Sequence, residues 1–264
     1  MITIDFTDQV VLVAGGGTGI GAAIARIFAA AGADIALSYF GSEEGARNVG
    51  EAIEAKGRRA LLRRVDSQRI PDIEAFVDEA IHEFNHVDVL VYNAGLTDPR
   101  PLFDITEQQW DQTLDINLKG MFFCARRVAA HLRDTQRPGS IVLLSSVHSI
   151  QAYPNHAHYA SSKGGINMLT RSLAYQLAPY GIRVNAVAPG ATYVERHRKE
   201  QLYEPQELAR QIPLRRVGAP EDIADVALYL ASNRAGYVTG QVVFADGGLT
   251  LPLALHEKSA EDPL

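Results

Sequence analysis

A glycine-rich turn between an apolar run and a helical segment is the feature that most constrains the fold of this chain. Residues 9–14 form a short apolar run, QVVLVA, of the kind found in strands buried on both faces. The turn GGGTGIG follows at 15–21, and the helical stretch 22–31 ends at Gly32. Glycines in this context let backbone amides at a helix N-terminus approach a pyrophosphate group closely. The pattern favours a dinucleotide-binding βαβ unit over a tight turn without a ligand.

Strand-like and helix-like segments alternate along the rest of the chain. The further predicted strands are residues 33–39, 61–65, 87–92, 141–145, 182–188 and 241–245. The further predicted helices are residues 42–56, a segment that begins near Pro71, and residues 107–117, 119–133, 159–179 and 221–231. No linker rich in Gly, Ser or Pro divides the sequence. We therefore predict an α/β fold, a doubly wound parallel sheet of about seven strands in a single domain, residues 1–264.

The segment 191–216 interrupts this alternation, because it is rich in charged residues and contains no clear strand. It carries Tyr193 and Tyr203 and follows the carboxyl end of the predicted strand 182–188. Long excursions at that end of a parallel strand are where lids and substrate loops lie. We therefore expect residues 191–216 to form a substrate-loop insertion.

The composition argues against several classes of partner. The net charge of −6 provides no basic footprint for nucleic acid. The single cysteine, Cys124, cannot form an internal disulfide or a multi-thiolate metal site. The N-terminus lacks the pattern of a secretory signal, and no apolar run approaches the ~20 residues that span a bilayer. We expect a cytoplasmic protein with a small-molecule substrate, without a nucleic-acid or membrane partner.

A serine, a tyrosine and a lysine form the strongest candidate for a catalytic centre. Ser146 ends the predicted strand 141–145, and Tyr159 opens a long helical segment thirteen residues later. Lys163 follows by four residues, so that its ammonium lies on the same helix face as the phenol. Acid–base catalysis near neutrality needs a shift of roughly three units from the tyrosine pKa of about 10. A neighbouring cation lowers this pKa, and the hydroxyl of Ser146 can hold a substrate oxygen.

Other polar residues follow the remaining predicted strands. The motifs Asn93-Ala94-Gly95 and Pro189-Gly190 each end a strand. Asp66 ends another, where its carboxylate either accepts a hydrogen bond from an adenine amino group or caps the helix that follows. Asn117 lies among hydrophobic residues, where its carboxamide needs hydrogen-bond partners.

Taken together, these motifs resemble the short-chain dehydrogenase/reductase family from about residue 6 to 250. The resemblance is carried, in order and spacing, by the glycine turn, Asn93-Ala94-Gly95, Asn117, Ser146, Tyr159-x-x-x-Lys163 and Pro189-Gly190. It implies a Rossmann-type fold that binds NAD(P), with Asn117, Ser146, Tyr159 and Lys163 as catalytic residues. It also assigns Lys163 to the nicotinamide ribose and Asn117 to a proton-relay water.

The resemblance further implies two sets of binding residues. The cofactor-binding residues are Gly15, Gly17, Thr18, Gly19, Ile20, Gly21, Tyr39, Ser42, Asp66, Ser67, Asn93, Ala94, Gly95, Tyr159, Lys163, Pro189, Gly190 and Thr192. The substrate-binding residues are Ser146, His148 and Tyr159. Within the family, the segments 145–148, 159–165 and 244–250 look most like the bacterial glucose 1-dehydrogenases.

Three positions depart from the family pattern. Ala14 replaces the usual threonine before the first glycine, and Tyr92 replaces the first asparagine of the common N-N-A-G. Val194 occupies the place of a threonine that often contacts the nicotinamide amide. Thr192, two residues earlier, is the alternative contact.

The end of the second predicted strand bears on the choice of cofactor. An NAD-preferring site has Asp or Glu at this place, whereas this chain has Tyr39 followed by Phe40. Thr18 fills the place beside the glycine turn where an arginine would attract a 2′-phosphate. Tyr39 and Ser42 leave a neutral pocket near a helix N-terminus, which tolerates an anion. We expect both NAD and NADP to work, with a slight preference for NADP.

The predicted reaction is reversible hydride transfer between a secondary alcohol or sugar hemiacetal and its carbonyl form. Tyr159 exchanges the proton, while Ser146 stabilises charge on the substrate oxygen. His148, His156 and His158 lie close to the tyrosine in sequence. Because no fixed i,i+4 pair with a carboxylate accompanies them, we expect a polar pocket wall and no metal.

Two other functions stay open. A 3-oxoacyl-carrier-protein-type reductase would use a basic docking patch, for which residues 196–199 (RHRK) are candidates, although a solvated helix face also accounts for them. A non-catalytic NAD(P)-binding sensor would not need the serine, tyrosine and lysine together. The resemblance, with the extra apolar faces of helices at about 106–134 and 157–180, predicts a homotetramer built on those helices.

Overall fold

A single sheet of seven parallel strands forms the centre of the computed structural model, which describes residues 4–194 and 204–251. The strand order is β3-β2-β1-β4-β5-β6-β7. The strands are β1 (Val10–Ala14), β2 (Asp34–Tyr39), β3 (Ala60–Arg64), β4 (Val89–Tyr92), β5 (Gly139–Leu144), β6 (Ile182–Pro189) and β7 (Val242–Ala245). The order reverses between β1 and β4, which opens a crevice at the carboxyl ends of these strands. The predicted doubly wound sheet is confirmed.

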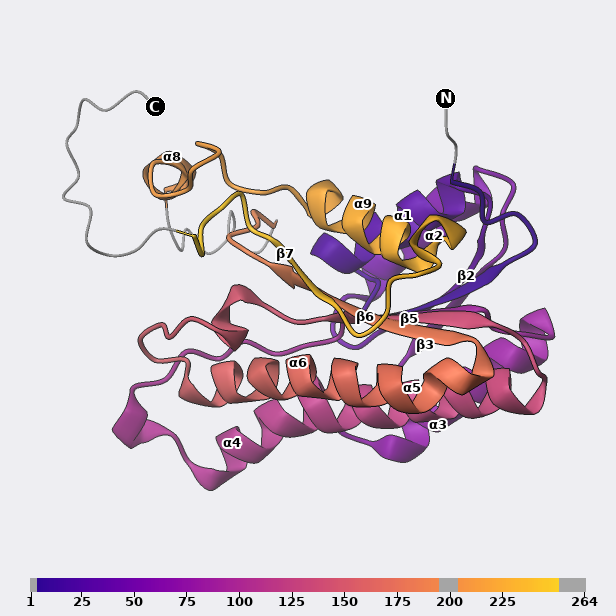
Figure 1. Cartoon of the computed structure of the whole chain (residues 1–264), viewed down its shortest axis with the longest axis horizontal. Coiled ribbons are helices and arrows are strands. Elements are labelled where there is room, and N and C mark those ends of the chain that lie inside the picture. The colour runs from indigo at the N-terminus through magenta and orange to yellow at the C-terminus, as the bar shows by residue number, and fades with distance from the viewer. Residues whose placement is uncertain (1–3, 195–203, 252–264) are drawn as a thin grey trace.

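Helices cover both faces of the sheet, with α1, α2 and α9 on one face and α3 to α6 on the other (Figure 1). The helices are α1 (Gly19–Ala30), α2 (Glu43–Glu54), α3 (Ile70–Phe84), α4 (Glu107–Leu114), α5 (Gly120–Asp134), α6 (Ala157–Leu177), α8 (Pro205–Ala209) and α9 (Pro220–Ala231). Short turns of helix are η1 (Leu102–Asp104), η2 (Asp115–Lys119), η3 (Val147–Ser149), η4 (Ala178–Tyr180) and η5 (Asn233–Ala235). None of the helices in the described ranges is long and apolar enough to cross a membrane.

Strand β1 shows how an uninterrupted apolar run supplies two cores. All five of its side chains are buried. Val10, Leu12 and Ala14 pack into the core that faces α3, α5 and α6. Val11 and Val13 pack into the core that faces α1, α2 and α9. Because alternate side chains of a strand point to opposite faces, both faces of β1 must be apolar.

The helix after β4 differs from the prediction. The sequence predicts separate helices at 107–117 and 119–133, whereas α4, η2 and α5 follow one another without a break from residue 107 to 134. The junction η2 is a π-helical turn, which accommodates an additional residue. It contains Asn117, whose side chain is completely buried.

The predicted substrate loop leaves the carboxyl end of β6. Thr192 forms an isolated parallel bridge with Gly218, and α8 lies within the segment. Residues 195–203, with Tyr203 and the basic residues 196–199, lie outside the described residues. In Figure 1, α8 lies on the left of the molecule, the side toward which the arrow of β6 points.

Candidate active site

Ser146 lies just beyond β5, at the N-cap of η3. Its hydroxyl oxygen accepts a hydrogen bond from the backbone N–H of His148 at 3.2 Å. The side chain is buried, and the Ser149 hydroxyl donates to the Ser146 carbonyl at 2.6 Å. These bonds fix the position of the Ser146 oxygen at the carboxyl edge of the sheet. Neither bond uses the Ser146 O–H as a donor.

Tyr159 and Lys163 lie one turn apart on α6, as the sequence predicts. The Lys163 Nζ atom is 5.5 Å from the centroid of the Tyr159 ring. It donates to the Leu144 carbonyl at 2.7 Å, so the ammonium is held at the end of β5. Burial lowers the pKa of Lys163 to about 8. The lysine therefore carries its charge at neutral pH, but less firmly than an exposed lysine.

Asn117 joins two of the predicted motifs. Its Oδ1 accepts from the Leu96 N–H at 2.7 Å, and its Nδ2 donates to the Leu96 carbonyl and to the Ser162 hydroxyl, both at 3.0 Å. A Cβ atom on Gly95 would lie 3.3 Å from Asn117 Oδ1 and 3.9 Å from Lys163 Nζ. The loop after β4, the π turn and α6 therefore meet at this point. The predicted need of Asn117 for partners is confirmed.

The glycine turn is shaped for close approach. Gly15 has φ of 78°, a left-handed conformation that favours glycine, and the Asn93 side chain donates to its carbonyl at 2.8 Å. A Cβ atom on Gly21 would lie 2.0 Å from the Gly15 carbonyl oxygen, so any other residue would displace the turn. The turn faces a cavity of about 370 Å³. An open cavity beside backbone amides at the start of α1 fits the adenosine and phosphate part of a dinucleotide.

Many of the predicted cofactor residues line this cavity. They are Gly15, Gly17, Thr18, Tyr39, Ser42, Asp66, Ser67, Asn93, Ala94 and Gly95. The lining also includes residues that the sequence did not single out as binding residues: Ser38, Phe40, Val65, Gln68, Leu96, Gln112 and Ile116. Gln112 and Ile116 come from α4 and η2. The sequence signal that this helix approaches the site was Asn117, the predicted site residue next to Ile116.

The remaining predicted cofactor residues do not line this cavity. Gly19, Ile20 and Gly21 open α1, while Tyr159 and Lys163 lie on α6. Gly190 donates its N–H to the Ala245 carbonyl at 3.0 Å just after Pro189, the last residue of β6. The Thr192 hydroxyl donates to the Gly190 carbonyl at 3.3 Å. A Cβ atom on Gly19 would lie 3.2 Å from Val194 Cγ1, so the segment after β6 reaches the glycine turn.

The surroundings of Asp66 decide between the two roles that the sequence left open, contact with adenine and capping of the next helix. Its Oδ1 accepts from the Gln68 N–H at 3.0 Å, which forms a local turn. Helix α3 begins at Ile70 with Arg69 as its N-cap, so the capping role is wrong. The side chain instead contributes to the cavity wall.

The three predicted histidines have different surroundings. His148 and His156 stack with ring centroids 5.2 Å apart and planes 7° apart, and each meets Tyr159 edge-on, at 5.7 and 6.0 Å. Tyr153, which the sequence did not single out, packs against both imidazoles. Burial and the neighbouring His156 lower the pKa of His148. His158 is completely buried and has no ring contact with this stack in the described ranges, so its predicted place in the pocket wall is not supported.

Several buried polar atoms have no hydrogen-bond partner among the described residues. They are Nδ1 of His148, both ring nitrogens of His158, and Oγ1 of Thr113 on α4. Within residues 4–194 and 204–251, no group of three or more His, Cys, Asp or Glu side chains is placed to hold a metal ion. One unpartnered nitrogen, Nδ1 of His148, thus belongs to the imidazole stack beside Tyr159.

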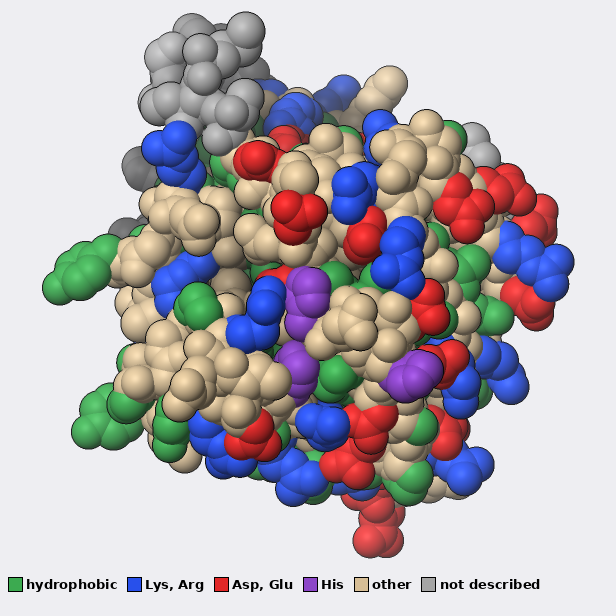
Figure 2. Space-filling model, turned by 90° about the vertical axis from the view of Figure 1, so that its right-hand side faces the viewer, with side chains coloured by type: hydrophobic (Ala, Val, Ile, Leu, Met, Phe, Trp, Pro, Cys, Tyr) green, Lys and Arg blue, Asp and Glu red, His purple; other side chains and the backbone are tan. Residues whose placement is uncertain are grey.

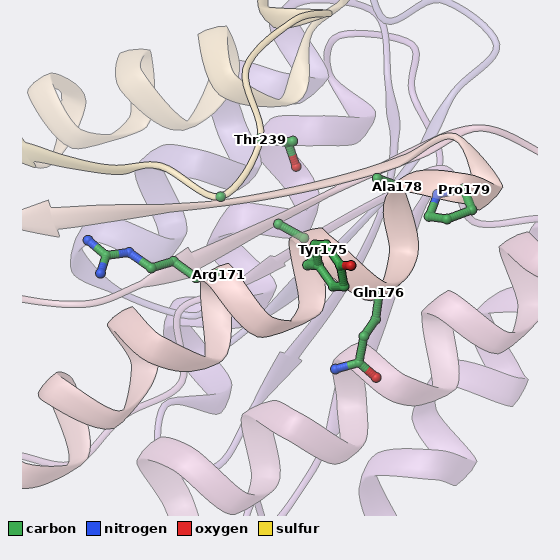
Figure 3. Close-up of a pocket in the computed structure, with 8 residues that line it drawn as sticks. Arg171, Tyr175, Gln176, Ala178, Pro179 and Thr239 are labelled. Carbon is green, nitrogen blue, oxygen red and sulfur yellow. The ribbon is translucent and has the colours of Figure 1, made fainter.

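A second, more open cavity of about 710 Å³ lies away from these residues (Figure 3). It is bordered by the last turns of α6 and by Thr239 and Gly240. Tyr175 and Arg171 point from α6 along its edge. None of the predicted site residues lines it.

Figure 2, which views the right-hand side of Figure 1, shows positive and negative side chains interspersed without a large patch of one sign.

Comparison with known proteins places this site in a family. The model of a family described as enoyl-(acyl carrier protein) reductase matches residues 14–250. A 3beta-hydroxysteroid dehydrogenase of Eggerthella lenta is 42% identical over 250 residues, which cover 94% of this chain and 95% of that protein. A 3-oxoacyl-[acyl-carrier-protein] reductase of Staphylococcus aureus is 39% identical over 240 residues, 90% of this chain and 96% of that protein.

Solved structures agree with these relatives. A protein from Sinorhizobium meliloti described as a short-chain alcohol dehydrogenase has a TM-score of 0.88 at 36% identity, over 94% of this chain and 99% of that one. Acetoin dehydrogenase from Enterobacter cloacae has a TM-score of 0.88 at 31% identity, over 96% and 99%. Fold, site and relatives thus define an oxidoreductase that acts on alcohol and carbonyl groups.

The chain belongs to the short-chain dehydrogenase/reductase family. Membership implies NAD(P) as the cofactor, which the glycine turn and its cavity fit. The finer prediction, a special likeness to glucose 1-dehydrogenases, is not what these relatives indicate, since their names refer to steroid, acyl-carrier and acetoin substrates.

Proposed function

We propose that the protein interconverts a secondary alcohol and its ketone, with Tyr159 exchanging the proton and Ser146 holding the substrate oxygen. The observation that carries this proposal is that Lys163 lies beside the Tyr159 ring and, with Asn117, reaches Gly95, which lines the glycine-turn cavity. Ser146 follows two residues after Leu144, whose carbonyl holds the Lys163 ammonium. NAD(P), when bound, accepts or supplies the hydride. The chain contributes orientation and the proton.

Each side chain has a proposed role that follows from its contacts. In the oxidation direction, the Tyr159 phenolate removes the hydroxyl proton, and the nearby Lys163 ammonium favours the phenolate. Ser146 donates to the substrate oxygen, where charge develops. Asn117 holds the loop after β4 against α6, and its assignment to a relay water stays a prediction.

We propose an apolar body for the substrate, because the loops beyond β4 to β7 expose large apolar side chains. The exposed fractions are 66% for Leu102, 96% for Phe103, 59% for Ile150, 62% for Tyr153, 66% for Leu214 and 80% for Leu251. We call these six residues the apolar rim. Exposed apolar groups that gather near a site mark a surface for an apolar ligand.

Backbone contacts connect the segments that carry the apolar rim. The Arg100 N–H donates to the Asn155 carbonyl at 2.8 Å, which joins the loop after β4 to the loop after β5. The Gln151 side chain donates to the Thr250 carbonyl at 3.4 Å, and the Leu214 N–H donates to the Gly247 carbonyl at 3.1 Å. The similarity to a hydroxysteroid dehydrogenase agrees with a bulky ring alcohol.

A sugar or polyol is the second candidate, favoured by the stacked His148 and His156. The unpartnered Nδ1 of His148 would accept a hydrogen bond from a sugar hydroxyl or donate one to its oxygen.

An acyl-carrier-protein substrate depends on residues 196–199, which lie outside the described residues. A cytoplasmic homotetramer with a slight preference for NADP completes the proposal.

A substrate panel tests the choice between these candidates. We expect kcat/KM for an apolar cyclic secondary alcohol to exceed that for glucose or a linear polyol by at least about 100-fold, or 2.7 kcal/mol. Phe103→Ser should lower kcat/KM for the apolar alcohol, and Tyr237→Ser, at an equally exposed aromatic residue outside the rim, should not. Faster turnover of glucose would reject the apolar substrate and support the sugar.

A further inference from the structure

We propose that Arg64 of β3 binds the 2′-phosphate of NADP and is the source of the preference for NADP over NAD. This inference rests on the proposed use of the glycine-turn cavity for a dinucleotide. The positive charge that recognises the phosphate on the adenosine ribose would then come from β3, a strand that carries none of the predicted cofactor residues.

Arg64 lies beside the cavity wall. It pairs in register with Tyr39, the last residue of β2. Its Nε donates to the Phe40 carbonyl at 3.2 Å, and its guanidinium carbon lies 5.0 Å from the centroid of the Phe40 ring. Phe40, Tyr39 and Ser42 line the cavity. The cation is therefore held against Phe40, one of the residues that close this part of the cavity.

The end of β2 is where a bound dinucleotide presents its ribose. In Rossmann-type units, an acidic residue near this place hydrogen-bonds the 2′-hydroxyl of NAD, and a nearby arginine accommodates the 2′-phosphate of NADP. A Cβ atom on Gly17 would lie 3.2 Å from Tyr39 Cβ and 2.5 Å from the Ser42 hydroxyl oxygen. The glycine turn and the wall beside Arg64 are thus in direct contact.

Arg64 retains donors for an anion. Its Nε bond leaves the two terminal nitrogens, and Arg64 forms no ion pair with a carboxylate among residues 4–194 and 204–251. The preceding Arg63, in contrast, is paired with Glu79 of α3 at 2.5 Å. Glu43, in the first turn of α2, is paired with Arg47 at 2.5 Å, which partly balances its charge. A guanidinium with free terminal N–H groups binds phosphate through paired hydrogen bonds.

The test compares two nucleotides that differ only in the 2′-phosphate. Binding of adenosine 2′,5′-bisphosphate and adenosine 5′-monophosphate to the full chain is measured by calorimetry, without turnover. Arg64→Gln should weaken binding of the bisphosphate by at least about 10-fold and leave the monophosphate within about twofold. Arg63→Gln is the matched control, because it removes an equal charge from the next residue and should change neither.

Other outcomes overturn the inference. Equal weakening of both nucleotides by Arg64→Gln would mean that the guanidinium contacts the adenine, and no change would mean that Arg64 does not reach the nucleotide. Should Arg64→Gln fail to fold, Arg64→Lys keeps the charge and should bind the bisphosphate more weakly than the wild type, with the monophosphate unchanged. Alcohol oxidation by a wild type that binds both nucleotides equally would reject the role of Arg64 and leave the proposed reaction standing.

Discussion

The two ends of the parallel sheet satisfy their polar groups differently. At the amino end, the Asp88 carboxylate accepts from the Val10 N–H at 2.9 Å and from Arg137 at 2.7 Å. The neighbouring His131 ring accepts from the Val87 N–H at 3.3 Å. None of these side chains has a buried polar atom without a partner in the described part of the chain. At the carboxyl end, buried nitrogens of His148 and His158 have no hydrogen-bond partner among the described residues.

This difference predicts that the amino end of the sheet serves stability and the carboxyl end serves activity. A buried polar atom without a partner costs about 1–3 kcal/mol, so the carboxyl end is the less stable arrangement. Polar atoms that are unsatisfied in the protein alone are those that a substrate can satisfy. The comparison teaches that substitutions at the carboxyl end should change activity more than stability, and those at the amino end the reverse.

The largest effect is expected for Tyr159→Phe. Loss of the phenolic oxygen removes the proposed proton acceptor, so kcat should fall by at least about 100-fold, the usual scale of general acid–base catalysis. Calorimetry should show that the dinucleotide still binds, because the glycine-turn cavity is unchanged. Near-full activity in this variant would show that another group exchanges the proton.

The opposite pattern, a loss of stability with little loss of activity, is expected for Asp88→Ala. The substitution leaves the Val10 N–H and Arg137 without their acceptor, which should lower the free energy of unfolding by about 2 kcal/mol. The kcat/KM value should stay within about twofold. Asp134→Ala is the control, because the pair of Asp134 with Arg133 is exposed and contributes little. A fall in kcat/KM of clearly more than twofold would contradict the proposed difference between the two ends.

Much of this arrangement could be predicted because the relevant residues are close in sequence. The strand, turn and helix at residues 9–31 form a local unit, and Tyr159 and Lys163 share a helix face by spacing alone. The need of Asn117 for partners followed from its apolar neighbours. The sequence could not identify Leu96 and Ser162 as those partners, because the contact depends on how α4 and α6 pack.

Other features depend on the pairing of strands in space or on the residue at which a helix begins. Arg64 and Tyr39 are 25 positions apart and become neighbours only through the register of β2 and β3. The sequence therefore found no arginine near the ribose. His156 precedes α6 and stacks on His148, whereas His158 is inside the first turn and is buried. A helix boundary shifted by two residues would exchange their roles, and boundaries are the least reliable part of a sequence-based prediction.

The smallest effect, expected for Thr113→Val, tests whether unsatisfied atoms lower the stability of the carboxyl side. Thr113 is completely buried on α4, and its hydroxyl has no partner in the described part of the chain. Valine has nearly the same shape, so the free energy of unfolding in urea should rise by up to about 1 kcal/mol. Thr170→Val is the matched control: Thr170 is equally buried, but its hydroxyl donates to the Ile166 carbonyl at 2.8 Å, so the substitution should not stabilise. Equal destabilisation by both substitutions would mean that a buried water satisfies Thr113 and that the carboxyl side is as well bonded as the amino end.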